Sequence, residues 1–199
     1  MKPKLFAIVL ATISALAGSA QADTERVRGT VVNFAGTALT VKAHDGKTDT
    51  VTLSPGWMIS GVAKASAADI KQGDFLGIAS APKTGGGSGA LEVMIFPAAL
   101  KGTGEGDRAW DLQPNSRMTN GTVASVTEVS GRTVTLTYGS GQKKQIAIPQ
   151  STPIVKFATA KPADLKPGAP VFVSAERGSN GKLVSRRVVV GNHGIAPPM

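Results

Sequence analysis

Apolar and polar residues alternate over short stretches in much of the chain. Leu39 and Val41 fall on one face of one such stretch, and Val51 and Leu53 fall on one face of the next. A period of two residues is typical of a β-strand with one buried face. Asp45-Gly46 lies between the two stretches and favours a tight turn, because glycine readily adopts a positive φ. The pattern therefore predicts short antiparallel strands joined by tight turns.

The chain also contains an internal repeat. The stretch RGTVVNFAGTALTV, which starts at Arg28, is echoed by NGTVASVTEVSGRTVTL from Asn120. Further along, AADIKQGDFLGIASA from Ala67 is echoed by PADLKPGAPVFVSA from Pro162. The two pairs occur in the same order. A repeat of this kind indicates that one structural unit occurs twice.

Each copy has room for a single helical turn. Asp69 in the first copy matches Asp164 in the second, and Gly73 matches Gly168. Glycine can take the left-handed conformation found at helix C-termini, so we expect these glycines to end the turns. We interpret the two aspartates as the residues that order the turns.

Each copy is predicted to form five strands, with the helical turn between the third and the fourth. This order is typical of a small barrel of the OB type. The predicted fold is all-β, with two tandem five-stranded OB-like β-barrels. The expected parts of the chain are a signal peptide (1–22), a first barrel (23–97), a connector (98–119), a second barrel (120–191) and a C-terminal tail (192–199).

A barrel of this size needs support. A unit of about 70 residues buries little more than roughly 60% of its unfolded surface. The chain has no cysteine, so no disulfide can compensate. We therefore expect the two barrels to pack on each other, with a tryptophan of the connector filling the seam.

The connector carries the candidate ligand-binding residues. In one interpretation it is a recognition loop, in which Trp110 is an apolar platform, Asp107 and Asp111 are acceptors, and Arg108 and Arg117 hold anions. In the other interpretation it is a structural linker, in which Trp110 anchors in a crevice and the charges pair locally. Both interpretations are open at the level of the sequence.

The N-terminus has the features of an exported protein. Lys2 and Lys4 form a basic region, the apolar stretch LFAIVLATISALAG follows, and small residues stand at Ala20 and Ala22. These features predict a cleaved secretory signal over 1–22 and a periplasmic location. A membrane anchor would need about 18–20 consecutive apolar residues, more than this stretch offers.

The rest of the chain is predicted to have no membrane-spanning segment. Removing residues 1–22 leaves 177 of the 199 residues and, with Lys2 and Lys4 gone, lowers the formal charge from +9 to +7. A positive charge favours anionic partners such as envelope polymers or lipid headgroups. The basic residues are spread along the chain rather than grouped in runs, which favours an ordinary contribution to solubility.

Residues for catalysis or metal binding are sparse. The absence of cysteine excludes thiolate and zinc–sulfur chemistry. His44 and His193 are the two histidines, and neither has a second histidine at ligand spacing. No serine stands in a G-x-S-x-G motif, and Glu92 and Glu105 lie in a strand and a linker with no reason to share a cleft. We predict no catalytic residue, no metal ligand and no cofactor.

Nucleotides and nucleic acids are also disfavoured as partners. In KTGGGSGA, Lys83 precedes the glycines and a strand follows, whereas a phosphate-binding loop needs Gly-Lys-Ser/Thr at the start of a helix. Single-stranded nucleic acid is bound through several stacking aromatic residues. Aromatic residues are few here, and Tyr138 keeps phase with Val134 and Leu136 of a predicted core.

The stretch FPAALKGTGEGDRAWDLQPNSRMTNGTV and the ending VVVGNHGIAPPM resemble an uncharacterised family of secreted bacterial proteins, mainly alphaproteobacterial. The resemblance covers essentially the whole mature chain and implies a signal peptide and tandem OB-like domains of unknown function. Members are sometimes labelled metal-transporter permeases, but a permease needs several spanning helices, which this sequence lacks. Asp107 stands where the family usually has a histidine, which argues against a metal site there.

We therefore expect a non-enzymatic periplasmic binding or scaffold module. Its partner would be an envelope component, a small anionic ligand or a protein, bound through the connector and the barrel rims. One alternative is a periplasmic accessory protein that handles copper or zinc through His44 and His193. A further alternative is a hydrolase, which would need a histidine within hydrogen-bond reach of a serine or an acid in a cleft.

Overall fold

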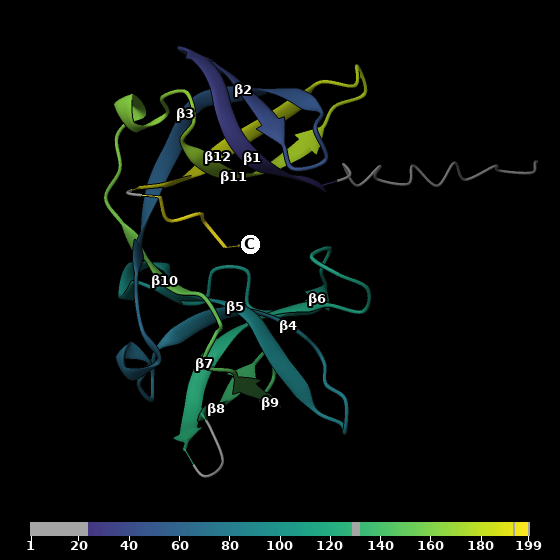
Figure 1. Cartoon of the computed structure of the whole chain (residues 1–199), viewed down its shortest axis with the longest axis vertical. Helices are drawn as coiled ribbons and strands as arrows, with labels where there is room; N and C mark the ends of the chain where they lie inside the picture. Colours follow the sequence, from purple (N-terminus) through teal and green to yellow (C-terminus); the bar gives the residue numbers. More distant parts are fainter. Residues whose placement is uncertain (1–23, 129–131, 193, 199) are drawn as a thin grey trace, which may run out of the picture.

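The computed structural model describes residues 24–128, 132–192 and 194–198. The signal peptide predicted over 1–22 lies outside the described residues. The fold is all-β, and its helical content is limited to short 3-10 turns. Two lobes are stacked along the long axis, and each contains a closed circuit of five strands (Figure 1). The prediction of an all-β protein built on five-stranded barrels is confirmed.

The upper lobe is one closed circuit. Its strands pair in the order β1, β2, β3, β12, β11 and back to β1, and every pairing is antiparallel except that of β3 with β12. We call it the upper barrel. Its strands are β1 (Thr24–Ala35), β2 (Ala38–Ala43), β3 (Thr48–Lys64), β11 (Pro170–Arg177) and β12 (Leu183–Gly191).

The lower lobe repeats this arrangement. Its strands pair in the order β7, β8, β9, β5, β4 and back to β7, and the parallel contact is the one between β5 and β9. We call it the lower barrel. Its strands are β4 (Phe75–Pro82), β5 (Ser88–Phe96), β7 (Arg117–Thr127), β8 (Arg132–Tyr138) and β9 (Gln142–Ile148).

The two copies of the repeat exchange strands. The first copy gives β1 to β3 to the upper barrel and β4 and β5 to the lower barrel, and the second copy does the reverse (Figure 1). The expectation that 23–97 and 120–191 each close a barrel is therefore wrong. The alternation of apolar and polar side chains specifies which face of each strand is buried, and so which strands can pair. It does not specify which copy supplies the partner, because the two copies present similar edges.

A central strand pairing relates the two barrels. The end of β3 runs antiparallel to β10 (Ile154–Ala158), and Val62 lies opposite Phe157. These two residues are 95 positions apart, as are Asp69 and Asp164, so they occupy the same place in the two copies. An approximate twofold axis therefore passes between Val62 and Phe157. Because β10 also pairs with β5, the two circuits form one continuous sheet.

Each copy has its helical turn where the repeat predicts it. The turns are η1 (Ala67–Asp69) and η3 (Pro162–Asp164). The Oδ2 atom of Asp69 accepts a hydrogen bond from the backbone N–H of Ser66 at 2.7 Å. The Oδ2 atom of Asp164 accepts one from the N–H of Lys161 at 2.8 Å. The interpretation that these aspartates order the turns is confirmed.

Contrary to the prediction from the sequence, the matched glycines do not lie at the C-termini of the helical turns. The 3-10 helices end at Asp69 and Asp164, whereas Gly73 and Gly168 lie four residues further on, in the bends that lead into β4 and β11. Their φ angles of 89° and 84° are left-handed, which explains why both copies carry glycine there. They shape the entry to the next strand and do not end the helix.

The apolar residues form three clusters. One fills the upper barrel and another fills the lower barrel. The third lies at the seam, and its members come from β3, β5, β10, β11 and β12. We call it the seam cluster, and its buried residues are Val62, Met94, Val155, Phe172 and Val189. The two barrels are thus packed on each other through side chains of both copies.

Gly29 and Gly121, which begin the matched G-T-V motifs, lie where two strands cross closely. A Cβ atom at Gly29 would lie 2.0 Å from the carbonyl oxygen of Lys42 in β2. One at Gly121 would lie 2.7 Å from the carbonyl oxygen of Thr137 in β8. Any other residue would push the neighbouring strand away. The repeat of this glycine therefore has a steric cause.

Gly29→Ala should lower the free energy of unfolding by about 2 kcal/mol, because a clash with backbone cannot be relieved by a rotamer change. Urea denaturation monitored by circular dichroism measures the effect. Gly89→Ala is the matched control, since a Cβ there would meet only the flexible side chain of Lys83, at 3.1 Å. Equal loss of stability in the two variants would contradict the steric explanation.

Candidate functional site

The connector folds back onto the lower barrel before it touches the upper one. After η2 (Ala98–Leu100), the strand β6 (Gly106–Ala109) pairs antiparallel with the start of β7. Trp110 follows directly. Its backbone N–H donates to the carbonyl oxygen of Ser116 at 2.8 Å, and the buried Ser116 hydroxyl donates to the Trp110 carbonyl oxygen at 3.0 Å. The loop between them is therefore closed at its base.

The ring of Trp110 bridges the two barrels. It is partly buried and packs against the seam cluster. Arg26 in β1 of the upper barrel places its guanidinium carbon 3.9 Å from the ring centroid. The guanidinium carbons of Arg28 and Arg108 lie 5.6 and 5.7 Å from the same centroid. These distances fit cation–π contacts, which strengthen when the cation is partly desolvated.

Asp111 fixes the connector to the upper barrel. Arg28 donates two hydrogen bonds to its carboxylate, from Nη1 at 3.1 Å and from Nη2 at 2.8 Å. The Nη1 atom of Arg26 lies 3.6 Å from Oδ2 of the same carboxylate. Burial alone would raise the pKa of Asp111, but the Arg28 hydrogen bonds and the two arginine charges outweigh it and hold the pKa below its usual value.

Asp107 fixes the connector to the lower barrel. Its carboxylate accepts hydrogen bonds from Thr119 Oγ1 at 2.6 Å, Lys144 Nζ at 2.9 Å and Arg117 Nε at 2.6 Å. Burial would raise the pKa of Asp107, but these three donors hold it below its usual value. Arg117 also donates to the Asp107 carbonyl oxygen at 3.1 Å. The pair thus ties β6 to β7.

The five residues predicted as a ligand site all contact other parts of the protein, and Trp110 is the one that packs against the seam cluster. Asp107, Arg117, Trp110 and Asp111 make the contacts described above, and Arg108 donates from Nη1 to the carbonyl oxygen of Gly104 at 2.8 Å. These contacts favour the structural interpretation of the connector. The sequence did not indicate Arg26 and Arg28, because they precede Asp111 by more than 80 positions.

A cleft of about 1130 Å³ lies between the two barrels. Its upper wall includes Arg28 and Val171, and its lower wall is formed by the segment 148–155. The segment 195–198 of the C-terminal tail lines it as well, and the chain end enters the space between the lobes in Figure 1. Sites for small molecules measure roughly 300–1,000 Å³, so this cleft is large enough for such a ligand.

One difference between the two copies lies at the cleft. In the first copy, Trp57 packs against the upper core and makes an edge-to-face contact with Phe34 at 5.6 Å. The position 95 residues later is Thr152, which lines the cleft. The register supports this match, because Ile59 and Ile154 pair with the equivalent residues of β12 and β5. The second copy thus has a smaller side chain at this position, on the wall of the cleft.

The charges along the cleft are mostly positive. Arg28, Lys64 and Arg132 line it, and Glu92 is the acidic residue among its lining side chains. Arg132 is fixed, because it donates to the Ala67 carbonyl oxygen and to the Glu128 carboxylate. The rest of the lining is largely aliphatic side chains and prolines. Such a surface suits an apolar group that carries a negative charge.

The metal and hydrolase alternatives gain little from the geometry. Among the described residues, no group of three or more histidine, cysteine or acidic side chains lies close enough to hold a metal ion. His44 is exposed where the cleft opens, and its side chain forms no hydrogen bond within the part of the chain that the structure describes. His193 lies outside the described residues. No helix of the described residues has the length and apolar character needed to cross a membrane.

Comparison of the chain with protein-family models, with curated proteins and with solved structures finds no match.

Proposed function

We propose that this protein is a non-enzymatic binding module of the periplasm, and that its ligand occupies the cleft between the barrels. The cleft is the main support for the proposal, because both barrels and the tail line it. The N-terminal export features support the compartment. An envelope component or a small anionic ligand fits the charge and the apolar walls.

The contacts of the connector favour the cleft, rather than the connector alone, as the place where the ligand binds. Asp107 and Asp111 hold the connector to the two barrels from opposite sides. A loop held in this way fixes the relative position of the cleft walls. It thereby prepares the site for a ligand without the entropy cost of ordering a mobile loop.

Lining chemistry favours recognition over catalysis. General base catalysis by histidine needs a second group that orients the imidazole. The side chain of His44 has no such partner among the described residues, and aliphatic side chains and prolines form most of the cleft. These features support a site that holds its ligand unchanged.

Filling the cleft with the side chain of the first copy tests this proposal. Thr152→Trp places at 152 the residue that stands at 57, and Thr152→Val is the control, because it loses the hydrogen bond to the Ala90 carbonyl oxygen but keeps the volume. The probe is the apolar anion 8-anilinonaphthalene-1-sulfonate, titrated by fluorescence. We expect Thr152→Trp to weaken binding at least about tenfold, a change of about 1.4 kcal/mol, and the control to bind as the wild type does.

Circular dichroism of each variant verifies that the fold is retained. A folded Thr152→Trp variant with unchanged probe affinity would show that the cleft is not the binding site. The proposal that the protein is not an enzyme is tested by mass spectrometry of any co-purified molecule before and after incubation with the wild-type protein. Recovery of a chemically altered molecule would contradict it.

A further inference from the structure

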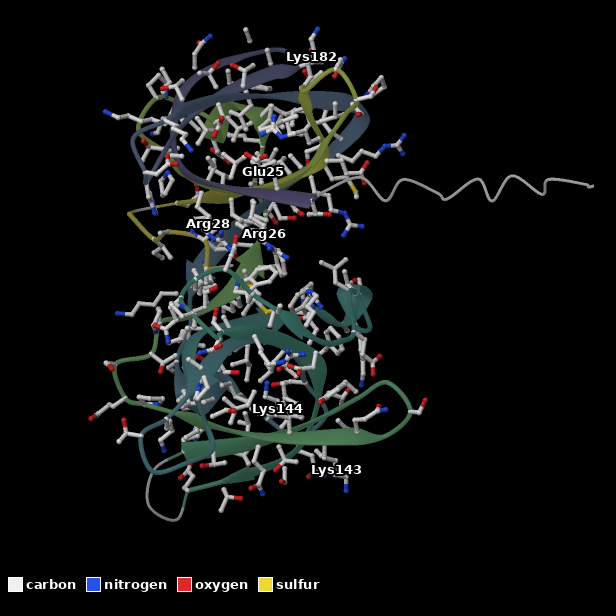
Figure 2. The ribbon with its side chains drawn as sticks, turned by 90° about the vertical axis from the view of Figure 1, so that its right-hand side faces the viewer. Glu25, Arg26, Arg28, Lys143, Lys144 and Lys182 are labelled. Carbon is white, nitrogen blue, oxygen red and sulfur yellow. The ribbon has the colours of Figure 1, made fainter. Side chains whose placement is uncertain are left out.

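Positive charge is concentrated around Trp110. Three guanidinium groups, those of Arg26, Arg28 and Arg108, lie within 5.7 Å of the ring centroid. One carboxylate, that of Asp111, lies among them. We call these five residues the arginine cluster. Figure 2 shows Arg26 and Arg28 at the edge of the upper barrel that faces the lower one.

The nearby carboxylates do not neutralise the cluster. Asp111 is taken by the two hydrogen bonds from Arg28, and Arg26 is 3.6 Å away from it. Glu25, the acidic neighbour on β1, pairs with Arg177. Asp107 on β6 accepts from Lys144 and Arg117 instead. The cluster therefore keeps an excess of two positive charges.

Of the three guanidinium groups, that of Arg28 is hydrogen-bonded to the Asp111 carboxylate and that of Arg26 is ion-paired with it at 3.6 Å, whereas Arg108 has no ion pair among the described residues. Arg108 donates to a neutral carbonyl oxygen, that of Gly104. Arg26 keeps 21% of its side chain exposed, so solvent and solutes reach it. Desolvation, and then the charge of Arg26, lower the pKa of Arg108 and outweigh the opposite effect of the Asp107 carboxylate. An anion bound here would relieve this repulsion.

We propose that the arginine cluster is a binding site for a phosphate-type anion, held by Arg26 and Arg108 beside Trp110. A guanidinium group binds phosphate through two parallel N–H donors, which gives geometry as well as charge. Arg28 lines the cleft and also a neighbouring polar cavity, which Arg26 shares with the acidic residues Glu25, Asp45, Asp49 and Asp111. Arg108 and Trp110 lie outside the lining of that cavity, and Arg28 is the residue of the cluster that connects it with the cleft.

This placement deepens the proposed function and rests on it. A ligand with a phosphate group at the cluster can place an apolar part in the cleft, which has the aliphatic walls for it. The phosphate group belongs either to a lipid headgroup or to a small phosphate ester. Both ligands would place a phosphate group at the arginine cluster, but only the lipid would gain affinity from an acyl chain in the cleft.

Isothermal titration of the full chain with inorganic phosphate tests the site. We expect wild-type protein to bind phosphate and Arg26→Gln and Arg108→Gln to bind it at least about tenfold more weakly. Arg186→Gln is the matched control, because it removes the same charge from an exposed position of β12 and should leave binding unchanged. If Arg186→Gln weakened phosphate binding equally, the effect would be due to the net charge of the protein, and the proposal would be overturned.

Arg26→Lys protects the experiment against misfolding. It keeps the charge beside the Trp110 ring but loses the planar fork, so the fold should be retained and phosphate affinity should fall several-fold. Absence of phosphate binding by the wild type, or full affinity in Arg26→Lys and Arg26→Gln, would each overturn the proposal.

Lysophosphatidylglycerol distinguishes the two sources. If the anion is a lipid headgroup, wild-type protein should bind monomeric lysophosphatidylglycerol more tightly than phosphate, and Thr152→Trp should remove that gain while still binding phosphate. Equal affinity for the two would support the small phosphate ester at the same site. If the protein binds phosphate but Thr152→Trp does not change its affinity for 8-anilinonaphthalene-1-sulfonate, the proposed ligand site in the cleft is contradicted and the phosphate site is not.

Discussion

Residues 24–103 and 104–198, produced as separate chains, should each fail to fold as a monomer. The first fragment has β1 to β3 of the upper barrel but lacks β11 and β12, which close it. Opening the circuit exposes the unpaired edges of β1 and β3 and the apolar residues between them. Since unpaired strand edges and an exposed core are both costly, a fragment that stays monomeric should be unfolded.

An equimolar mixture of the two fragments should recover the native circular dichroism spectrum and elute as one species of the full-length size. Each fragment alone should be unfolded or should form a homodimer. In a homodimer Val62 would face Val62 of a second copy, in place of Phe157. A folded monomer of 24–103 would mean that β4 and β5 can return to their own copy, and would contradict the dependence of each barrel on both copies.

Trp110→Ala should lower the free energy of unfolding by about 3 kcal/mol. Truncation of a large aromatic residue in a packed site leaves a cavity. It also removes the ring beneath the guanidinium of Arg26, which lies 3.9 Å from the ring centroid. Urea denaturation followed by the remaining tryptophan, Trp57, and by circular dichroism measures the change.

Trp110→Phe is the matched variant. The Nε1 atom of Trp110 is buried and has no hydrogen-bond partner within the described residues. Phenylalanine keeps an aromatic ring without this unsatisfied donor, so the gain offsets part of the lost contact and the net change should stay below about 1 kcal/mol. Unchanged stability in Trp110→Ala would show that the connector does not hold the seam.

The strands and their closure into barrels follow from local patterns. Leu39 and Val41 alternate as the sequence indicates and are fully buried in the upper core. Asp69 and Asp164 order equivalent turns, because the hydrogen bond of each is to a backbone N–H three residues earlier. Such features depend on neighbours in the sequence, so one chain is enough to predict them.

The exchange of strands could not be predicted in the same way. Val27 in β1 pairs with Val173 of the other copy, and nothing near either residue specifies that choice. A strand edge is recognised by its hydrogen-bonding pattern and its side-chain faces, and both copies offer equivalent edges. The long continuous β3 carries the first copy out of the upper barrel and so decides which partner is reached.

The candidate site was predicted in part. Trp110 and Asp111 contact the upper barrel, but their partners there, Arg26 and Arg28, come from a distant strand. The cleft was missed. A comparison of the copies for differences as well as matches would have indicated it, because Trp57 is replaced by Thr152 at the point where space opens.

The first and last strands of the protein close the same barrel. β1 and β3 come first in the sequence, yet their circuit stays open until β11 and β12 join it. The lower circuit needs nothing beyond β9 and can close before β11 and β12 are available. We therefore expect assembly to proceed from the middle of the sequence outward, with the N-terminal strands unpaired at their outer edges until the C-terminal strands arrive.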